Sequence, residues 1–184
     1  MEKSKSSLLI LFSVIVLDLI GFGIVIPILP FYAEQYGANA TLLGLLLTSY
    51  AVMQFLFSPI WGKLSDQIGR KKVLLLTMGG SVLGLLILGL AHSLTLLFVG
   101  RILSGAFGAN ISVASAYVTD VTTPENRAKG MGMIGAAFGI GFILGPAFGG
   151  MLSVYGYSVP ILAAAGLGAV NVVYAMFRLG ESHS

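Results

Sequence analysis

The chain has 184 residues, a formal net charge of +3 and no cysteine, and it is 57% hydrophobic before its 25 glycines are counted. Only 9% of its residues are charged, whereas charged residues make up about 25% of an ordinary soluble domain. So few charges cannot cover the surface of a water-soluble globule, which excludes a cytosolic enzyme, a nucleic-acid binder and a disordered tail. The composition is typical of an integral membrane protein.

Apolar stretches follow one another along the chain, and each can supply the roughly 20 residues that a membrane-spanning helix needs. The last stretch, from Gly130 to Phe177, contains no charged residue and is too long for one crossing. We divide it at residues 153–158, where turn-forming residues and tyrosines occur together. The sequence therefore predicts an all-α bundle of six transmembrane helices, at about 8–30, 42–61, 73–91, 94–117, 130–152 and 158–178.

The basic residues are predicted to gather on one side of this bundle. Lysine and arginine occur before the first span, between the second and third, between the fourth and fifth, and at the end of the sixth. The loops on the opposite side, near Glu34, His92 and Tyr155, contain neither. Because cytoplasmic loops are enriched in lysine and arginine, we expect both termini to be cytoplasmic. Arg101 is the one basic residue inside a predicted span.

An internal repeat is indicated by a single shift of the sequence that lays the first three spans on the last three. Pro59 and Gly62, at the end of the second span, then coincide with Pro146 and Gly149 of the fifth. Three spans are an odd number, so the second unit would cross the membrane upside down, as in secondary transporters with midplane substrate sites. We therefore expect one bundle, residues 1–184, made of inverted repeats at about 8–91 and 94–178.

The segment between the second and third spans is predicted to be a tight cytoplasmic turn. Gly62 and Gly69 stand near its ends and permit positive φ. Asp66 lies four residues before the basic cluster that begins with Arg70 and Lys71. The turn therefore combines a carboxylate and cations within a short, constrained segment.

The fourth and fifth spans carry two further patterns. In the fourth, Arg101 is followed by small residues. In the fifth, three glycines recur at every fourth position and so share one face, which permits very close helix contact, while a proline bends the helix. The residues of this second pattern are Gly141, Gly145, Pro146, Gly149 and Gly150.

Together these patterns resemble the loop signature, the helix-4 arginine motif and the helix-5 antiporter motif of the major facilitator superfamily. The first span, with Asp18 and the nearby Gly-Phe-Gly, is similar to that of drug:proton antiporters. Residues 117–128 and the closing Glu181-Ser182-His183 are most similar to tetracycline and multidrug exporters. Two positions depart from the pattern: Gln67 replaces a basic residue, and the third span lacks the acidic residue that tetracycline exporters carry there.

Four polar side chains are candidates for proton coupling or substrate binding. A charge in the middle of a membrane costs at least ~2.5–3.5 kcal/mol, so Asp18 is interpreted as a carboxyl that exchanges a proton or attracts a cationic substrate. The alternative is a carboxylate neutralised by a neighbouring helix. The resemblance implies that Arg101 polarises Asp18 or a shared water, whereas a structural role would be hydrogen bonding to backbone carbonyls. Gln54 and Asn110 are expected to line a cavity or to bond to a neighbouring helix.

The resemblance also implies a cytoplasmic gate. According to the resemblance, Asp66 and Arg70 form a latch that locks the outward-open state, and Asp120 is an interaction partner of Arg70. The alternative is a solvated loop that only follows the positive-inside rule.

The resemblance implies proton-coupled efflux of amphipathic, drug-like molecules by alternating access across the bacterial inner membrane. It implies that no cofactor is needed and that the proton gradient supplies the energy. The partners it implies are membrane lipid and a small-molecule substrate, and no nucleic acid. The family has twelve helices, so this chain is expected to supply one half and to pair with a parallel second copy or a separate chain. A truncated or non-transporting membrane module and an importer of small metabolites remain alternatives. Neither an enzyme nor a metal site is expected, because no nucleophile–base pair occurs and His92 and His183 are isolated.

Overall fold

A computed structural model describes the backbone of residues 2–182 and the side chains of residues 6–182. All regular structure in this range is helical. Six of its helical segments are long and apolar enough to cross a membrane, and α4 and α5 together form one of them, which confirms the predicted number of spans. The helices are α1 (Glu2–Glu34), α2 (Ala40–Ile68), α3 (Arg70–Gly89), α4 (Leu94–Ala106), α5 (Asn110–Val121), α6 (Pro124–Ser153) and α7 (Ser158–Arg178).

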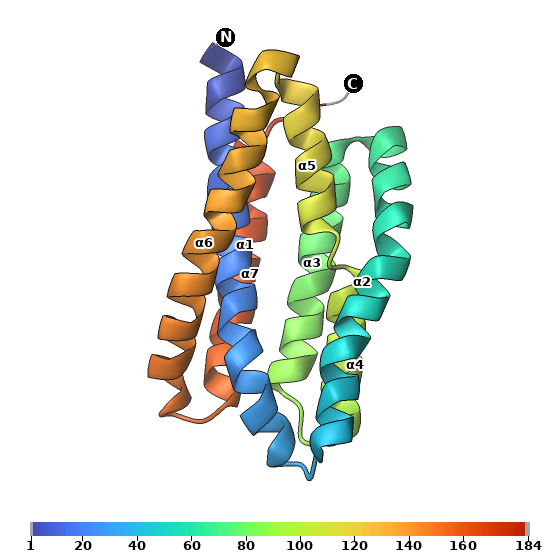
Figure 1. Cartoon of the computed structure of the whole chain (residues 1–184), viewed down its shortest axis with the longest axis vertical. Coiled ribbons are helices and arrows are strands. Elements are labelled where there is room, and N and C mark those ends of the chain that lie inside the picture. The colour runs from blue at the N-terminus through green and yellow to red at the C-terminus, as the bar shows by residue number, and fades with distance from the viewer. Residues whose placement is uncertain (1, 183–184) are drawn as a thin grey trace.

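The helices stand side by side in two groups (Figure 1). In one group α1 packs on α6 and α7, and in the other the span formed by α4 and α5 packs on α2 and α3. Contacts between α3 and α7 join the groups. If the first, second and third spans are exchanged with the fourth, fifth and sixth, the main pairs of packed spans stay the same. Two inverted units of one structure would give this result. The repeat itself stays a prediction.

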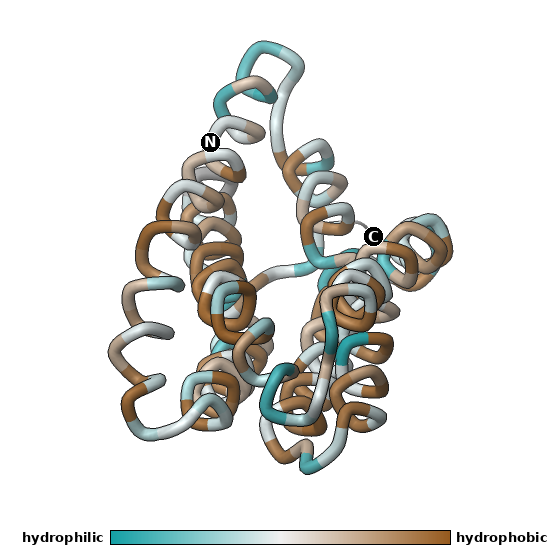
Figure 2. The backbone as a smooth tube through the Cα atoms, turned by 60° about the horizontal axis from the view of Figure 1, so that its bottom comes forward, coloured by the Kyte–Doolittle hydropathy of each residue, from teal (hydrophilic) through white to brown (hydrophobic). Residues whose placement is uncertain are grey.

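Both described ends of the chain lie at one end of the bundle, which we name the terminal end (Figure 1). The α2–α3 and α5–α6 turns lie there as well, and the α1–α2, α3–α4 and α6–α7 turns lie at the opposite end. In Figure 2 the hydrophilic segments gather at the turns and hydrophobic segments run along the helices. Large apolar side chains such as Phe55, Ile143 and Phe177 face outward, as a lipid-exposed surface requires.

The turn between α2 and α3 is much shorter than the sequence predicted. Helix α2 continues through Gly62 to Ile68, and Gly69 alone turns the chain with φ of 106°. The expectation of a loop beginning at Gly62 is therefore wrong. A glycine inside a helix lowers its stability without ending it, and of Gly62 and Gly69 only Gly69 has a positive φ, which favours glycine.

The fourth span is interrupted, which the sequence analysis did not predict. Residues 107–109 leave the helix between α4 and α5. The carbonyl groups released there accept hydrogen bonds from side chains of α2: Trp61 Nε1 donates to Ala106 O at 2.6 Å and Gln54 Nε2 donates to Gly108 O at 2.5 Å. Inside a membrane such a break is stable only where protein groups or a cavity satisfy the backbone.

Helix α1 and helix α6 meet backbone to backbone. A Cβ added at Gly145 would lie 2.5 Å from the Cα of Gly23, and one added at Gly141 would lie 2.6 Å from the Cβ of Leu19. The close contact that the glycine spacing predicts is therefore present. Gly149 also faces α1, whereas Gly150 lies on another face with nothing within 4 Å of an added Cβ. Helix α6 continues through Pro146 to Ser153.

Candidate functional site

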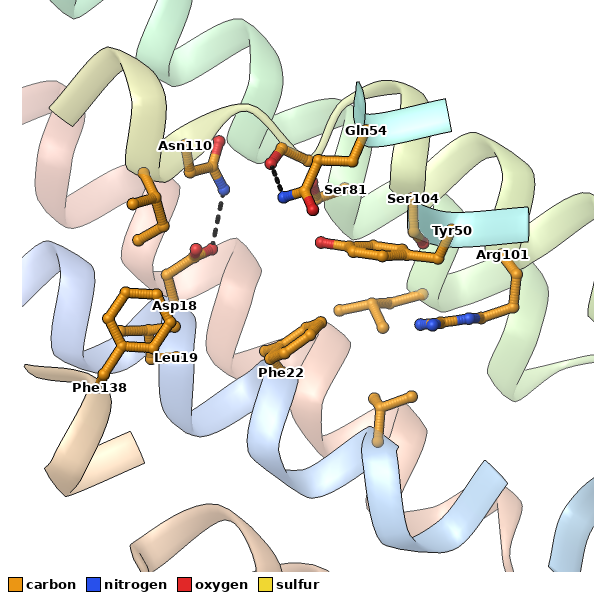
Figure 3. Close-up of a pocket in the computed structure, with 14 residues that line it drawn as sticks. Asp18, Leu19, Phe22, Tyr50, Gln54, Ser81, Arg101, Ser104, Asn110 and Phe138 are labelled. Atoms are coloured by element: carbon orange, nitrogen blue, oxygen red, sulfur yellow. Dashed lines mark hydrogen bonds between the residues drawn. The ribbon is translucent and has the colours of Figure 1, made fainter. Parts of the chain in front are cut away.

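A cavity of about 290 Å³, which we name the central cavity, lies among the helices (Figure 3). Helices α1 to α6 each contribute lining residues. All four polar side chains singled out in the sequence line this one cavity: Asp18, Gln54, Arg101 and Asn110. Tyr50 and Ser104, to which the sequence analysis gave no role, line it as well. The structure thus gathers residues separated by most of the chain.

Asp18 is held at one side of the cavity by a single amide. Asn110 Nδ2 donates a hydrogen bond to Asp18 Oδ1 at 3.0 Å. Asn110 is the first residue of α5, directly after the break in the fourth span. The hydrogen-bond donor beside Asp18, Asn110 Nδ2, is uncharged. The acceptor of the same amide, Asn110 Oδ1, is buried and has no partner among the described residues.

Arg101 lies at the opposite side of the cavity, with Tyr50 between it and Asp18 (Figure 3). Arg101 is 5% exposed, and its Cζ is 4.4 Å from the centroid of the Tyr50 ring, so the contact is a cation–π interaction. Its Nε has no hydrogen-bond partner among the described side chains. Among residues 6–182 both ion pairs are made by Arg70, so Arg101 and Asp18 are not paired directly.

Aromatic rings form much of the remaining wall. Phe22, Tyr50 and Phe138 line the cavity, and the ring centroids of Phe22 and Tyr50 are 5.5 Å apart. Phe142, which lies outside the lining, stacks on Phe138 with centroids 6.0 Å apart. Gln54 both lines the cavity and bonds to Gly108, so the two alternatives expected for it occur together. The cavity thus has an acidic side, a basic side and an apolar aromatic wall, as an amphipathic ligand requires.

A second charged site, which we name the Arg70 cluster (Asp66, Arg70 and Asp120), lies at the terminal end. Arg70 Nε is 2.9 Å from Asp120 Oδ2, and Arg70 Nη1 is 2.5 Å from Asp66 Oδ1 and 2.6 Å from Ser65 Oγ. The side chain of Arg70 is 10% exposed and that of Asp66 is 60% exposed. The structure therefore brings the three predicted gate residues together.

Residues 180–182 contact Asp120 and the start of α3 beside this cluster, a feature not predicted from the sequence. Glu181 Oε1 accepts a hydrogen bond from the backbone N–H of Lys71 at 3.2 Å, and Ser182 Oγ donates to Asp120 Oδ2 at 3.3 Å. Tyr117 donates to Gly180 O at 2.9 Å. Lys71 thus takes part through its backbone. Glu181 was noted in the sequence only as part of a resemblance, because nothing local to it indicates that it reaches the α2–α3 turn.

Two other residues missed in the sequence, Tyr50 and Ser104, had a usable signal. Tyr50 precedes Gln54 by one helical turn, and Ser104 follows Arg101 by three residues, so each shares a helix face with a predicted site residue. Among the described residues, no three histidine, aspartate or glutamate side chains gather as a metal site would require.

Comparisons with known proteins agree with this architecture. A family model described as Major Facilitator Superfamily matches residues 11–184. Tetracycline resistance protein, class C, of Escherichia coli is 39% identical over 98% of this chain and 46% of its own length. Multidrug resistance protein 2 of Bacillus subtilis is 34% identical over 100% of this chain and 46% of its own. The chain therefore spans about half the length of the curated relatives it matches.

A solved structure gives the same picture. The human organic anion transporter MFSD10 (TETRAN) superimposes with a TM-score of 0.87 at 26% sequence identity. The superposition covers 97% of this chain and 48% of that one.

Proposed function

The chain belongs to the major facilitator superfamily, and we propose that it acts as one half of a proton-coupled exporter of amphipathic, drug-like molecules. Relatives named for tetracycline and multidrug resistance, and a structural relative named for organic anion transport, support this class of substrate. Because each of these proteins is about twice as long, transport by this chain requires a second half. We propose a second six-helix bundle in that role.

The observation that carries the proposal is a carboxyl group that lines the central cavity without a paired cation within residues 6–182. Asp18 has one hydrogen-bond donor, Asn110, and no cation paired with it among the described residues. An ionised carboxylate stripped of water is costly. Opening and closing of the cavity to water therefore changes the affinity of Asp18 for a proton, which is the coupling that an antiporter needs.

Arg101 contributes to this coupling through the cavity and not through direct contact. The Tyr50 ring lies between the two charges. A water or a substrate in the cavity is then the link between Asp18 and Arg101. This is the second of the two routes that the family resemblance suggested.

The Arg70 cluster is proposed to act as the latch of the cytoplasmic gate. Arg70 joins α3 to Asp120 at the end of α5 and to Asp66 at the end of α2. Breaking and remaking such contacts is how two packings of one bundle alternate. In this account the terminal end faces the cytoplasm, as the distribution of lysine and arginine predicts, in the plasma membrane of a bacterium.

Transport in everted membrane vesicles under a pH gradient tests the proposal. Tetracycline, a lipophilic cationic dye and a lipophilic anionic dye serve as substrates, and a pH-sensitive dye reports proton movement. Substrate-driven proton flux is expected with the unmodified chain and its loss with Asp18→Asn. Glu34→Gln, which removes an exposed carboxylate far from the cavity, is expected to retain the flux.

Two outcomes would contradict the proposal. Unchanged coupled transport by Asp18→Asn would remove Asp18 from the mechanism. Absence of flux with every substrate, while crosslinking in the native membrane shows only a monomer, would favour a membrane module that does not transport.

A further inference from the structure

The basic side of the central cavity has unsatisfied hydrogen-bonding capacity. Within the part of the chain whose side chains are described, Arg101 Nε is a buried donor without a partner, and Ser104 Oγ, one helical turn away, is a buried hydroxyl without a partner. Buried polar groups in proteins are almost always hydrogen-bonded, and an exception of this kind calls for an explanation. Both residues line the cavity, so a molecule bound there is the most direct source of the missing acceptor.

The charge of Arg101 is also uncompensated. Guanidinium groups stay protonated in proteins, and both ion pairs within residues 6–182 belong to Arg70. The face of Tyr50 attracts the cation, but a ring face accepts none of the in-plane hydrogen bonds that the five N–H groups of a guanidinium offer. Asp18 does not fill this role, because Asn110 holds it on the far side of Tyr50 (Figure 3).

We propose that Arg101 binds an anionic group of the transported molecule, such as a carboxylate or a sulfonate. The proposal rests on the proposed function, because it assigns one part of the same cavity to one part of the substrate. The apolar body of the molecule lies along Phe22 and Tyr50, whose rings border the space between the two charged sides. The substrate class is therefore an aromatic organic anion, or a zwitterion whose cationic end faces Asp18.

The rigid geometry of the guanidinium makes this proposal specific. The Tyr50 ring lies against one face of the Arg101 guanidinium and does not block the N–H groups in its plane, which can bind the two oxygens of an anionic group as a fork. A lysine at the same position carries the charge but not the fork, and it stacks less well on an aromatic ring. Arg101→Lys is therefore expected to keep part of the preference for an anion, and Arg101→Gln none of it.

Binding of two matched probes to the purified full chain in lipid nanodiscs tests the proposal. The probes are 2-naphthoate and 2-naphthamide, which have nearly the same size and differ in charge, measured by equilibrium dialysis at neutral pH. The unmodified chain is expected to bind naphthoate at least tenfold more tightly. Arg101→Gln is expected to bind both probes with the affinity that the unmodified chain has for the amide.

Arg178→Gln is the matched control, because it removes one arginine from an exposed position at the end of α7. It is expected to retain the full preference for naphthoate. Retained binding of naphthamide by Arg101→Gln shows that this variant is folded. A partial preference for naphthoate in Arg101→Lys, which keeps the charge, tests the contribution of the guanidinium geometry separately.

Equal binding of the two probes by the unmodified chain, binding of neither, or an intact preference in Arg101→Gln would each overturn the proposal. Because dialysis needs no pH gradient and no second half, its result is independent of transport. A preference for naphthoate without transport would contradict the proposed function alone, and coupled transport without the preference would contradict the anion site alone.

Discussion

Two arginines of this protein are buried to a similar degree and have opposite surroundings. Arg70 is 8% exposed and Arg101 is 5% exposed. Arg70 contacts two carboxylates and a serine hydroxyl, whereas Arg101 has an aromatic face beside it and an Nε without a partner. A buried charge that is fully paired can hold helices together. One that is left without partners costs stability, and a bound ligand is what can repay that cost.

The largest expected effect is on the paired arginine. Asp120→Ala removes the partner at 2.9 Å from Arg70 Nε and leaves a buried cation poorly paired, so we expect a loss of about 3 kcal/mol in the free energy of unfolding. Unfolding by sodium dodecyl sulfate in mixed micelles measures it. Asp66→Ala is the control: its side chain is 60% exposed, and the loss should stay below about 1 kcal/mol. Equal losses in both variants would show that Asp120 has no special role in pairing Arg70.

The second-largest effect is expected at the contact between α6 and α1, the helix that carries Asp18. This contact is made by backbone atoms and not by charged groups. Gly145→Ala would place a Cβ 2.5 Å from Gly23 Cα, so α1 and α6 must separate, at a cost of about 2 kcal/mol. Gly150→Ala meets no atom within 4 Å and should change stability by no more than about 0.5 kcal/mol. The same unfolding measurement compares them. If Gly150→Ala were the more damaging, the close crossing of α1 and α6 would not be important for stability.

The smallest effect is expected at the unpaired arginine and has the opposite sign. Arg101→Met replaces a buried cation, which has no ion-pair partner among residues 6–182, with an apolar chain of similar length. We expect the free energy of unfolding to be the same as in the unmodified chain or about 1 kcal/mol higher, because the proposed anion site, and not stability, would account for the charge. A loss as large as that of Asp120→Ala would mean that Arg101 is structural and that its contrast with Arg70 is mistaken.

The sequence predicts the number of spans well because that inference needs only hydrophobic length and the position of charges. Prediction of the helix bounds fails where a side chain that is distant in the sequence determines the local backbone conformation. The chain leaves the helix at residues 107–109 because Gln54 and Trp61 of another helix accommodate the freed carbonyls, and the only local signal is Gly108. The same break sets the start of α5 and so the position of Asn110.

The candidate site could be predicted only in part for a similar reason. Polar residues inside apolar spans are conspicuous, so Asp18 and Arg101 were identified from the sequence. Which of them touch depends on the rotation of each helix about its axis, and Tyr50 lies between the two. The partners of Arg70 lie up to fifty positions away, and their grouping came from a family resemblance, not from spacing.

The central claim is that the cavity around Asp18 and Arg101 is where the substrate binds. Because the chain has no cysteine, a single introduced thiol reports on a single position. Ser81→Cys places a thiol in the lining of the cavity, and Gln35→Cys places one at the exposed turn after α1. With 2-naphthoate present, a small water-soluble thiol reagent should label Ser81→Cys several-fold more slowly and Gln35→Cys at an unchanged rate. Equal labelling of Ser81→Cys with and without the probe would contradict the account.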